Sequence, residues 1–297
     1  MKRFINPDKS TWKSLTKRSS ASYDSLEPLA KSIFKKVEKE GDLAIRGYTL
    51  KFDKVQLESN MVSSHEISTA AQRIPEKLKI AIQKAKNNIE VFHKAQITST
   101  VQVETQPGVS CWQKKLPIEK VGLYIPGGSA PLFSTVLMLA VPAKIAGCNK
   151  LILCSPPDNK GMLPDVILYT ANLCGVDYIF KVGGMQAIAG MTLGTESIPK
   201  ADKIFGPGNQ FVTVAKQLAT KYQVSIDMPA GPSELMVVAD KTGNPDFIAS
   251  DLLSQAEHGP DSQVILVTNN IKIADTTFEK ISEQLENLER KVTAQKA

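Results

Sequence analysis

Three uncharged polar side chains lie at or just after the ends of β-branched runs that lead into glycine-containing loops: Tyr124, Gln186 and Asn209. Asn209 directly follows the Gly-Pro-Gly sequence at 206–208 and opens a helical pattern. Glycines let a backbone approach a ligand closely, and a helix N-terminus attracts anionic groups. These side chains could therefore contact the ribose, carboxamide or phosphate of a dinucleotide. The loop lacks the third glycine of the G-x-G-x-x-G fingerprint, so taken alone it is better explained as an ordinary turn with Asn209 as N-cap.

Gln255 and His258 are the second group of residues that could do chemistry. Asn244-Pro245 predicts the N-cap and first residue of a helix, and Gly259-Pro260 predicts its end. Residues at i and i+3 share one helix face, so both side chains could occupy adjacent positions around a metal. A glutamine carbonyl is an uncommon zinc ligand and two ligands do not make a site. The spacing alone therefore favours a histidine placed at a helix C-terminus by the helix dipole.

The cysteines show no signature of nucleophilic or metal chemistry. None of the four belongs to a C-x-x-C pair, and the chain contains no G-x-S-x-G nucleophile elbow. Their apolar or strand contexts are of the kind that leaves a thiol protonated and unreactive. We therefore expect reduced thiols, mostly in the core, at Cys111, Cys148, Cys154 and Cys174.

Composition and charge argue against several classes of protein. With 297 residues, 42% hydrophobic and 22% charged, the chain has the make-up of a folded globular protein. The formal charge of +6 is spread over helical stretches in which acids are interleaved with lysines, and only 6% of residues are aromatic, unlike a nucleic-acid binder. The longest apolar run, 136–141, is too short to span a membrane, and the N-terminus shows no secretory signal. We therefore expect a cytoplasmic protein with no membrane or nucleic-acid partner.

The first part of the chain is predicted to be mostly helical. Apolar residues recur with the helical period over 25–48 and 66–94, and Pro75 must start or kink a helix. Residues 101–112 alternate like a strand, with a turn at Pro107-Gly108.

From Lys120 onward the pattern predicts an α/β fold. Short β-branched runs alternate with helical stretches, which indicates parallel strands joined by right-handed crossovers. In such sheets ligands bind at the carboxyl ends of the strands. Four strand ends carry Gly/Pro-rich loops that should build one crevice, at 124–128, 181–184, 205–208 and 227–233. A strand at 263–268 and a helix at about 273–288 follow, and they look like part of an unfinished sheet.

The loop sequences, in their order along the chain, resemble those of one known family. They are LYIPGGSAPLFSTVLMLAVPAKIAGC, KVGGMQAIAGMTLGTESIP, KIFGPGNQFVTVAKQ, IDMPAGPSEL and DLLSQAEHGPDSQ. Together they resemble the N-terminal two thirds of histidinol dehydrogenase, over residues 22–297. Members of this family oxidise L-histidinol to L-histidine through histidinal in two NAD-dependent steps, which close histidine biosynthesis.

The resemblance implies cofactors and roles for individual residues. The positions that match the family's NAD contacts are Tyr124, Gln186 and Asn209. Ser233 matches a substrate contact. Gln255 and His258 resemble two zinc ligands that also touch the substrate, a role that their spacing alone does not favour. The resemblance thus implies one zinc ion per active site of the complete enzyme.

The remaining site residues of the family have no match in this sequence. The resemblance implies that a Glu-His acid/base pair, and an Asp and a His that complete the zinc shell, lie beyond Ala297. It also implies a homodimer whose partner supplies the final ligating segment. We therefore expect no catalytic acid/base residue among 1–297, and no activity from this polypeptide alone.

The resemblance also implies a domain layout. A small helical arm would occupy 1–20, followed by two Rossmann-like domains with mostly parallel sheets, one inserted into the other. The first domain would comprise 21–120 and 240–297, and the inserted domain 121–239.

Two other interpretations stay open at the level of sequence. One is a truncated ligand-binding fragment or pseudoenzyme that keeps the loops without turnover. The other is an aldehyde dehydrogenase-like oxidoreductase in which a cysteine forms a thiohemiacetal with its substrate. Cys154, at a strand end, is the least unsuitable cysteine for that role.

Overall fold

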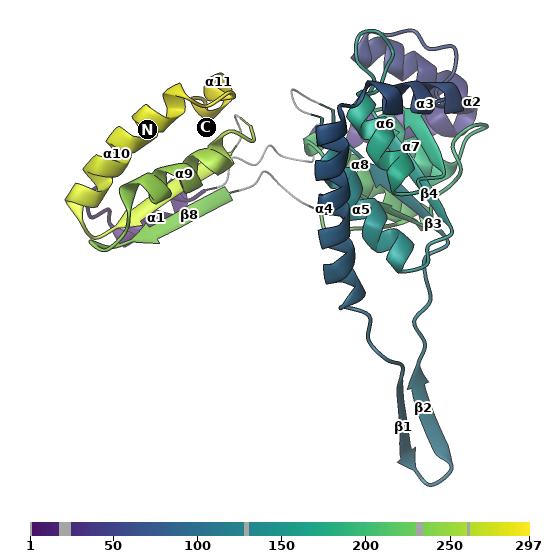
Figure 1. The fold of residues 1–297 in the computed structure, drawn as a ribbon, viewed down its shortest axis with the longest axis horizontal. Helices are drawn as coiled ribbons and strands as arrows, with labels where there is room; N and C mark the ends of the chain where they lie inside the picture. The colour runs from purple at the N-terminus through teal and green to yellow at the C-terminus, as the bar shows by residue number, and fades with distance from the viewer. Residues whose placement is uncertain (1, 18–24, 128–130, 230–233, 260–261) are drawn as a thin grey trace. The chain divides into compact units, whose positions relative to one another are not determined.

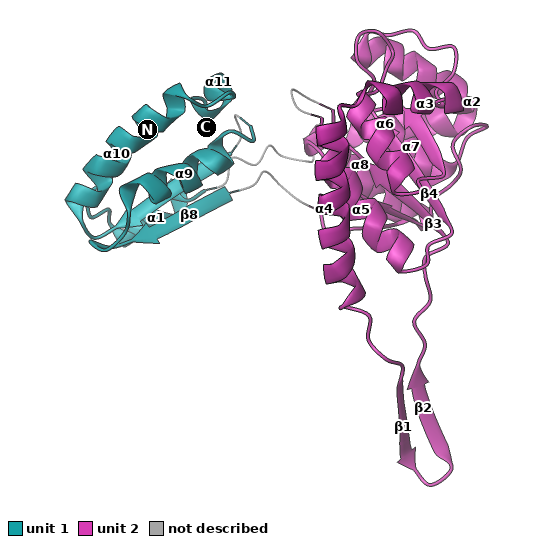
Figure 2. Cartoon of the chain, viewed as in Figure 1, with its two compact units in different colours: residues 1–21, 230–297 teal, residues 22–229 magenta. Residues whose placement is uncertain are grey.

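The computed structural model describes residues 2–17, 25–127, 131–229, 234–259 and 262–297. The chain divides into two compact units, unit 1 with residues 1–21 and 230–297 and unit 2 with residues 22–229 (Figure 2). None of the described helices has both the length and the apolar character needed to cross a bilayer.

Unit 2 is built on a five-stranded sheet in which every neighbouring pair is parallel. The strand order is β5-β4-β3-β6-β7, so the chain runs outward in one direction from β3 and in the other from β6. The point between β3 and β6 is therefore the topological switch point of a doubly wound fold. The prediction of parallel strands is confirmed. The strands are β3 (Lys120–Tyr124), β4 (Lys150–Ser155), β5 (Tyr178–Lys181), β6 (Lys203–Phe205) and β7 (Ser225–Ile226).

Helices cover both faces of this sheet (Figure 1). Ile152 and Cys154 of β4 point into one apolar cluster, and Leu151 and Leu153 into another, because successive side chains of a strand face opposite sides. A strand buried on both faces must be apolar throughout, which explains the run at 151–154. The first cluster contains buried residues of α2 (Glu27–Asp53), α7 (Gly184–Leu193) and α8 (Gln210–Ala219). The second contains those of α3 (Ser64–Arg73), α4 (Glu76–Lys94), α5 (Phe133–Ile145) and α6 (Asp165–Leu173).

The predicted helical segments of the first part are confirmed, with two local signals that fix their bounds. Gly41 interrupts the helical dihedrals of α2 with φ 51° and ψ −129°, so this long helix is kinked there. Pro75 is the N-cap of α4, and α3 begins with a capping box of Ser63 and Glu66.

Residues 101–113 form an antiparallel hairpin, as the turn signal at Pro107-Gly108 predicts. Its strands are β1 (Val101–Gln106) and β2 (Val109–Gln113), and every residue in both is exposed. In the ribbon the hairpin extends away from the sheet of unit 2 (Figure 1).

Unit 1 contains a smaller parallel sheet. Its two strands are β8 (Glu234–Ala239) and β9 (Gln263–Thr268), joined through α9 (Pro245–Ala256). One face, with Val237 and Leu266, packs against Ile248 and Ile273. On the other face, Val238 is 74% exposed. The remaining helices of unit 1 are α1 (Lys9–Leu15), α10 (Ile271–Glu286) and α11 (Lys291–Ala294).

The division into units differs from the predicted domains. The prediction joined 21–120 to 240–297, whereas in the structure residues 22–120 belong to the same compact unit as 121–229. The physical reason is burial: α2, α3 and α4 pack on α7, α6 and α5, respectively. Ile33 and Phe34 of α2, both fully buried, supply apolar surface that one face of the sheet needs.

Candidate functional site

The carboxyl edge of the five-stranded sheet brings together the loops after β3, β4, β5 and β6. Pro156, after β4, lies between two of them, since a Cβ added at Gly127 or at Gly183 would lie 2.4 Å from its side chain. The loop after β6 meets the end of β3, because a Cβ at Gly206 would lie 2.1 Å from the Tyr124 carbonyl oxygen. Only glycine fits at 206, where φ is also +132°. These contacts flank the switch point, the place where doubly wound sheets bind nucleotides.

Tyr124 is the last residue of β3, and its ring is buried, with 4% of the residue exposed. The backbone N–H of Gly184 donates a hydrogen bond of 3.0 Å to its hydroxyl oxygen. Burial raises the pKa of Tyr124 to about 12. The hydroxyl therefore keeps its proton at neutral pH, and it can donate a hydrogen bond but not act as a base.

Gln186 lies in the first turn of α7 and is 1% exposed. Its side chain lies close over Gly184, because a Cβ added there would lie 2.9 Å from the Gln186 Oε1. Gly184 has a φ of +63° and is also the donor to Tyr124. The structure thus brings Tyr124 and Gln186 together around one glycine at the start of α7.

Asn209 caps α8, with its Oδ1 accepting a hydrogen bond of 3.2 Å from the Val212 N–H. The capping role considered from sequence is confirmed, and the residue is also exposed. The helices α7 and α8 both begin at the carboxyl edge of the sheet, and helix N-termini favour anionic groups. The backbone and amide groups here suit a phosphate-containing ligand.

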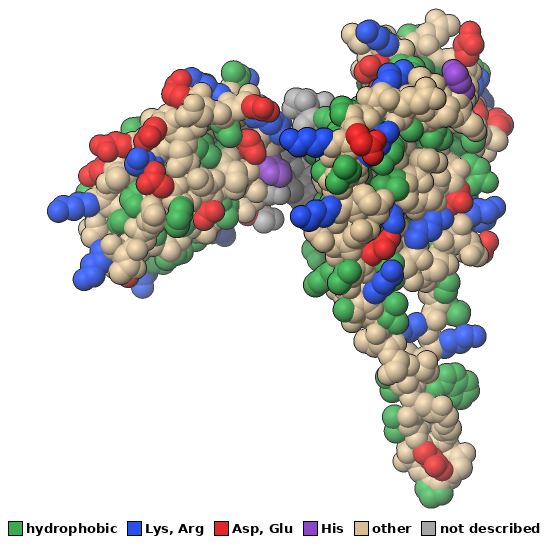
Figure 3. Space-filling view, in the orientation of Figure 1, with side chains coloured by type: hydrophobic (Ala, Val, Ile, Leu, Met, Phe, Trp, Pro, Cys, Tyr) green, Lys and Arg blue, Asp and Glu red, His purple; other side chains and the backbone are tan. Residues whose placement is uncertain are grey.

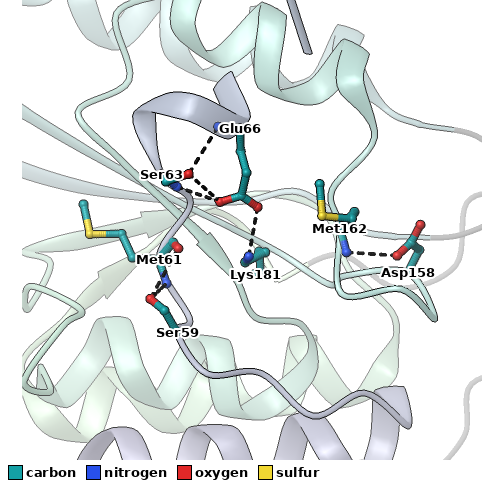
Figure 4. A network of polar contacts seen from close by, with 7 residues as sticks. All are labelled: Ser59, Met61, Ser63, Glu66, Asp158, Met162 and Lys181. Atoms are coloured by element: carbon teal, nitrogen blue, oxygen red, sulfur yellow. Dashed lines mark hydrogen bonds and ion pairs between the residues drawn. The ribbon is translucent and has the colours of Figure 1, made fainter. Parts of the chain in front are cut away.

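A second polar network joins the end of β5 to the start of α3 (Figure 4). Lys181, at the end of β5, donates a hydrogen bond of 2.9 Å to Glu66, whose other carboxylate oxygen accepts from the Ser63 N–H at 2.8 Å. Burial acts to raise the pKa of Glu66, but the bonds from Ser63 and Lys181 outweigh it and hold the pKa below its usual value. The ion pair therefore ties the start of α3 to the strand that precedes Gln186.

Gln255 and His258 lie in unit 1, at the end of α9. The predicted start of this helix is confirmed, with Asn244 as N-cap, but the helix ends at Ala256, so His258 lies just beyond it. The His258 N–H donates to the Gln255 carbonyl at 3.2 Å, which keeps the two residues adjacent. His258 is exposed, and the side-chain Nε2 of Gln255 lies 3.4 Å from the Ser262 hydroxyl, which leaves its Oε1 as an acceptor.

The two residues supply only part of a metal site. An imidazole nitrogen and an amide oxygen are possible zinc ligands, and a catalytic zinc needs three protein ligands and a water. Among the described residues, no three His, Cys, Asp or Glu side chains gather closely enough to hold a metal ion. Ser233, the predicted substrate contact, lies outside the described residues.

The structure does not favour a cysteine nucleophile. Cys154 is fully buried in the apolar cluster beneath α7 and α8, and burial raises the pKa of its thiol far above the usual value. Cys148 and Cys174 are also buried, and Cys111 is exposed on the hairpin. The prediction that the cysteines lie mostly in the core is therefore confirmed.

Charged side chains are mixed over the visible surface of both units. On the face in Figure 3, lysines and arginines lie among aspartates and glutamates rather than in one cluster. This distribution offers no argument for a polyanionic partner.

Asp53, the last residue of α2, is a polar residue near this edge that sequence reasoning missed. Burial raises its pKa to about 6, and its Oδ2 has no hydrogen-bond partner among the described residues. Its charge also acts to raise the pKa of Tyr124. The sequence shows only an acid in the last turn of an amphipathic helix, which carries no such signal.

The fold defines a doubly wound α/β protein in which polar side chains gather at the switch point of the sheet. The family model described as histidinol dehydrogenase matches residues 16–297. The chain therefore belongs to the histidinol dehydrogenase family, a family of oxidoreductases.

Individual relatives agree with this membership. The chain is 54% identical to a histidinol dehydrogenase of Bacteroides thetaiotaomicron over 100% of this chain and 69% of that protein. It is also 54% identical to one of Salmonella typhimurium, over 95% of this chain and 65% of that protein. The crystal structure of histidinol dehydrogenase from Elizabethkingia anophelis superposes with a TM-score of 0.93 at 53% identity, covering 99% of this chain and 68% of the other.

Proposed function

We propose that this protein takes part in the NAD-dependent oxidation of L-histidinol through histidinal to L-histidine, with one zinc ion per active site. The observation that carries the proposal is the family membership over residues 16–297 together with the loops gathered at the switch point of unit 2. We propose a cytoplasmic location and a homodimeric enzyme on the same basis. Histidinol oxidation by a chain extended to the full length of its relatives distinguishes this proposal from an inactive ligand-binding protein.

In this proposal the dinucleotide is held at the carboxyl edge of the sheet of unit 2. Asn209 and the first turns of α7 and α8 offer amide donors to phosphate and ribose oxygens. Tyr124, which stays protonated, and Gln186 hold the start of α7 in place and can donate to the dinucleotide. When bound, NAD accepts the hydride that leaves the carbinol carbon.

Gln255 and His258 are proposed as zinc ligands and substrate contacts, with Ser233 as a further substrate contact. His258, which is exposed, offers a ring nitrogen, and Gln255, in the last turn of α9, offers an amide oxygen. When bound, zinc orients the substrate rather than supplying a hydroxide. The proton that leaves the hydroxyl needs a base, and Tyr124 is unsuited because it stays protonated at neutral pH.

The experiment that tests the NAD site compares two cap variants of residues 1–297. Asn209→Ala removes a helix cap and the proposed ligand contact, and should weaken NAD binding about three- to tenfold in a calorimetric titration. Asn270→Ala removes the N-cap of α10 in unit 1 and should leave the affinity for NAD unchanged. An equal affinity in both variants and the unaltered chain would remove Asn209 from the site.

A further inference from the structure

Gly206 has both of its backbone polar groups bound by charged side chains. Its N–H donates a hydrogen bond of 2.8 Å to Asp227 Oδ2, and its carbonyl accepts one of 2.7 Å from Lys216 Nζ. Lys216 and Asp227 also form an ion pair with each other. The three residues come from α8, from the loop that precedes it, and from the end of β7.

Lys216 is an unusual residue at its position, because it is only 5% exposed. It lies within the buried face of α8, where Val212, Ala215 and Ala219 join the apolar cluster. A buried ammonium group is costly unless it is paired and hydrogen-bonded, and an apolar side chain often packs as well or better. Packing alone therefore does not account for a lysine here, whereas its bond to the Gly206 carbonyl does.

Gly206 lies close to two residues that are predicted to contact NAD, Tyr124 and Asn209. Gly206 lies against the Tyr124 backbone with no room for a side chain, and Asn209 follows three residues later as the cap of α8. The orientation of the Gly206 peptide therefore sets where Asn209 and the start of α8 lie relative to the end of β3. Lys216 and Asp227 lie within two of the loop sequences that carry the family resemblance, 203–217 and 226–235, but the sequence did not single out either as a site residue.

We infer that Lys216 and Asp227 are positioning residues for the dinucleotide: they act as a brace that holds the 206–209 loop in its binding conformation. The inference rests on the proposed NAD site. The brace is distinct from a direct ligand contact, since both charges are directed at Gly206 and at each other. In a chain extended to the full length of its relatives, loss of the brace should raise the KM and Kd for NAD while leaving kcat and the affinity for histidinol nearly unchanged.

The first test replaces both members of the brace, with Lys216→Met and Asp227→Leu in one chain. Replacing a whole ion pair by apolar residues is often tolerated by the fold, whereas removing one partner is not. We expect a moderate fall in thermal stability, because the Gly206 N–H and carbonyl lose their partners. The Kd for NAD should rise by roughly tenfold or more, because small misplacements of binding groups have large effects.

A matched control pair lies at the opposite, amino edge of the same sheet. Asp177 accepts hydrogen bonds from Lys144 at 3.2 Å and from the Leu151 N–H at 2.8 Å, so it also joins a lysine to a strand-end amide. Lys144→Met with Asp177→Leu should leave the Kd for NAD unchanged.

Two milder variants keep the inference testable if the double replacement fails to fold. Lys216→Arg and Asp227→Asn preserve most of the side-chain volume and should each raise the Kd for NAD a few fold, with Asp227→Asn the milder because its oxygen can still accept from Gly206. If the unaltered chain binds no NAD, or Asn209→Ala binds it normally, the proposed site fails. If those two behave as expected but every folded brace variant binds NAD like the unaltered chain, the brace is overturned.

Discussion

The two groups of predicted site residues are supported very differently by their surroundings. At the carboxyl edge of unit 2, Tyr124 and Gln186 are 4% and 1% exposed and are fixed through Gly184. At the end of α9 in unit 1, His258 is exposed and lies beyond the last helical residue. The fold of unit 2 thus fixes the side chains proposed to bind NAD, whereas Gln255 and His258 would depend on further ligands for their geometry.

The largest effect on activity is expected at His258, one of the two residues that depend on further ligands. In a chain extended to the full length of its relatives, His258→Ala should remove zinc and lower histidinol oxidation at least about a hundredfold, because a strong nitrogen ligand is lost. Metal analysis and an NADH-production assay measure both. His65→Ala, an exposed histidine on α3, is the matched control and should change neither. Full zinc content in His258→Ala would show that the metal is held elsewhere.

At the carboxyl edge of unit 2, a substitution is expected to lower the stability of the fold. Gly206→Ala should lower the free energy of unfolding by roughly 2–4 kcal/mol, since the new Cβ meets the Tyr124 carbonyl in an unfavourable backbone conformation. Gly108→Ala in the hairpin turn has a φ of +82° with nothing within 4 Å of its Cβ, so it should cost only about 1–2 kcal/mol. Chemical denaturation compares them, and equal losses would refute the close contact at 206.

A smaller, pH-dependent effect is expected at Asp53. Its pKa is raised from 3.8 to about 6 by burial, so the native state binds more protons than the unfolded chain between these values. Stability should therefore fall as pH rises through this window, and the penalty is complete above it. Asp53→Asn should raise the free energy of unfolding by about 1–2 kcal/mol at pH 7 and by nearly nothing at pH 3.5. A stabilisation independent of pH would assign the effect to packing instead.

The sequence predicted elements and caps well because these signals are local. The Asn244-Pro245 start of α9, the hairpin turn at Pro107-Gly108 and the cap at Asn209 all depend on a few neighbouring residues. The alternation of β-branched and helical stretches likewise predicted the parallel sheet, because central strands such as β4 are apolar on both faces.

Tertiary partners could not be predicted in the same way. The amphipathic pattern of α2 reveals an apolar face but not the sheet that covers it, and α2 packs in unit 2 rather than with 240–297. The burial of the Tyr124 ring and the pairing of Lys216 with Asp227 depend on residues far apart in sequence. Only the contacts between strands and helices decide these features.

The central claim is that the carboxyl edge of unit 2 holds the dinucleotide. Hydrogen exchange of residues 1–297 with and without NAD tests this claim most directly. We predict slower exchange of backbone amides in the first turns of α7 and α8, where Gln186 and Asn209 lie. Amides around Gln255 and His258 should exchange at unchanged rates, since these residues are proposed to serve metal and substrate. Protection confined to unit 1, or none at α7 and α8 under saturating NAD, would contradict the account.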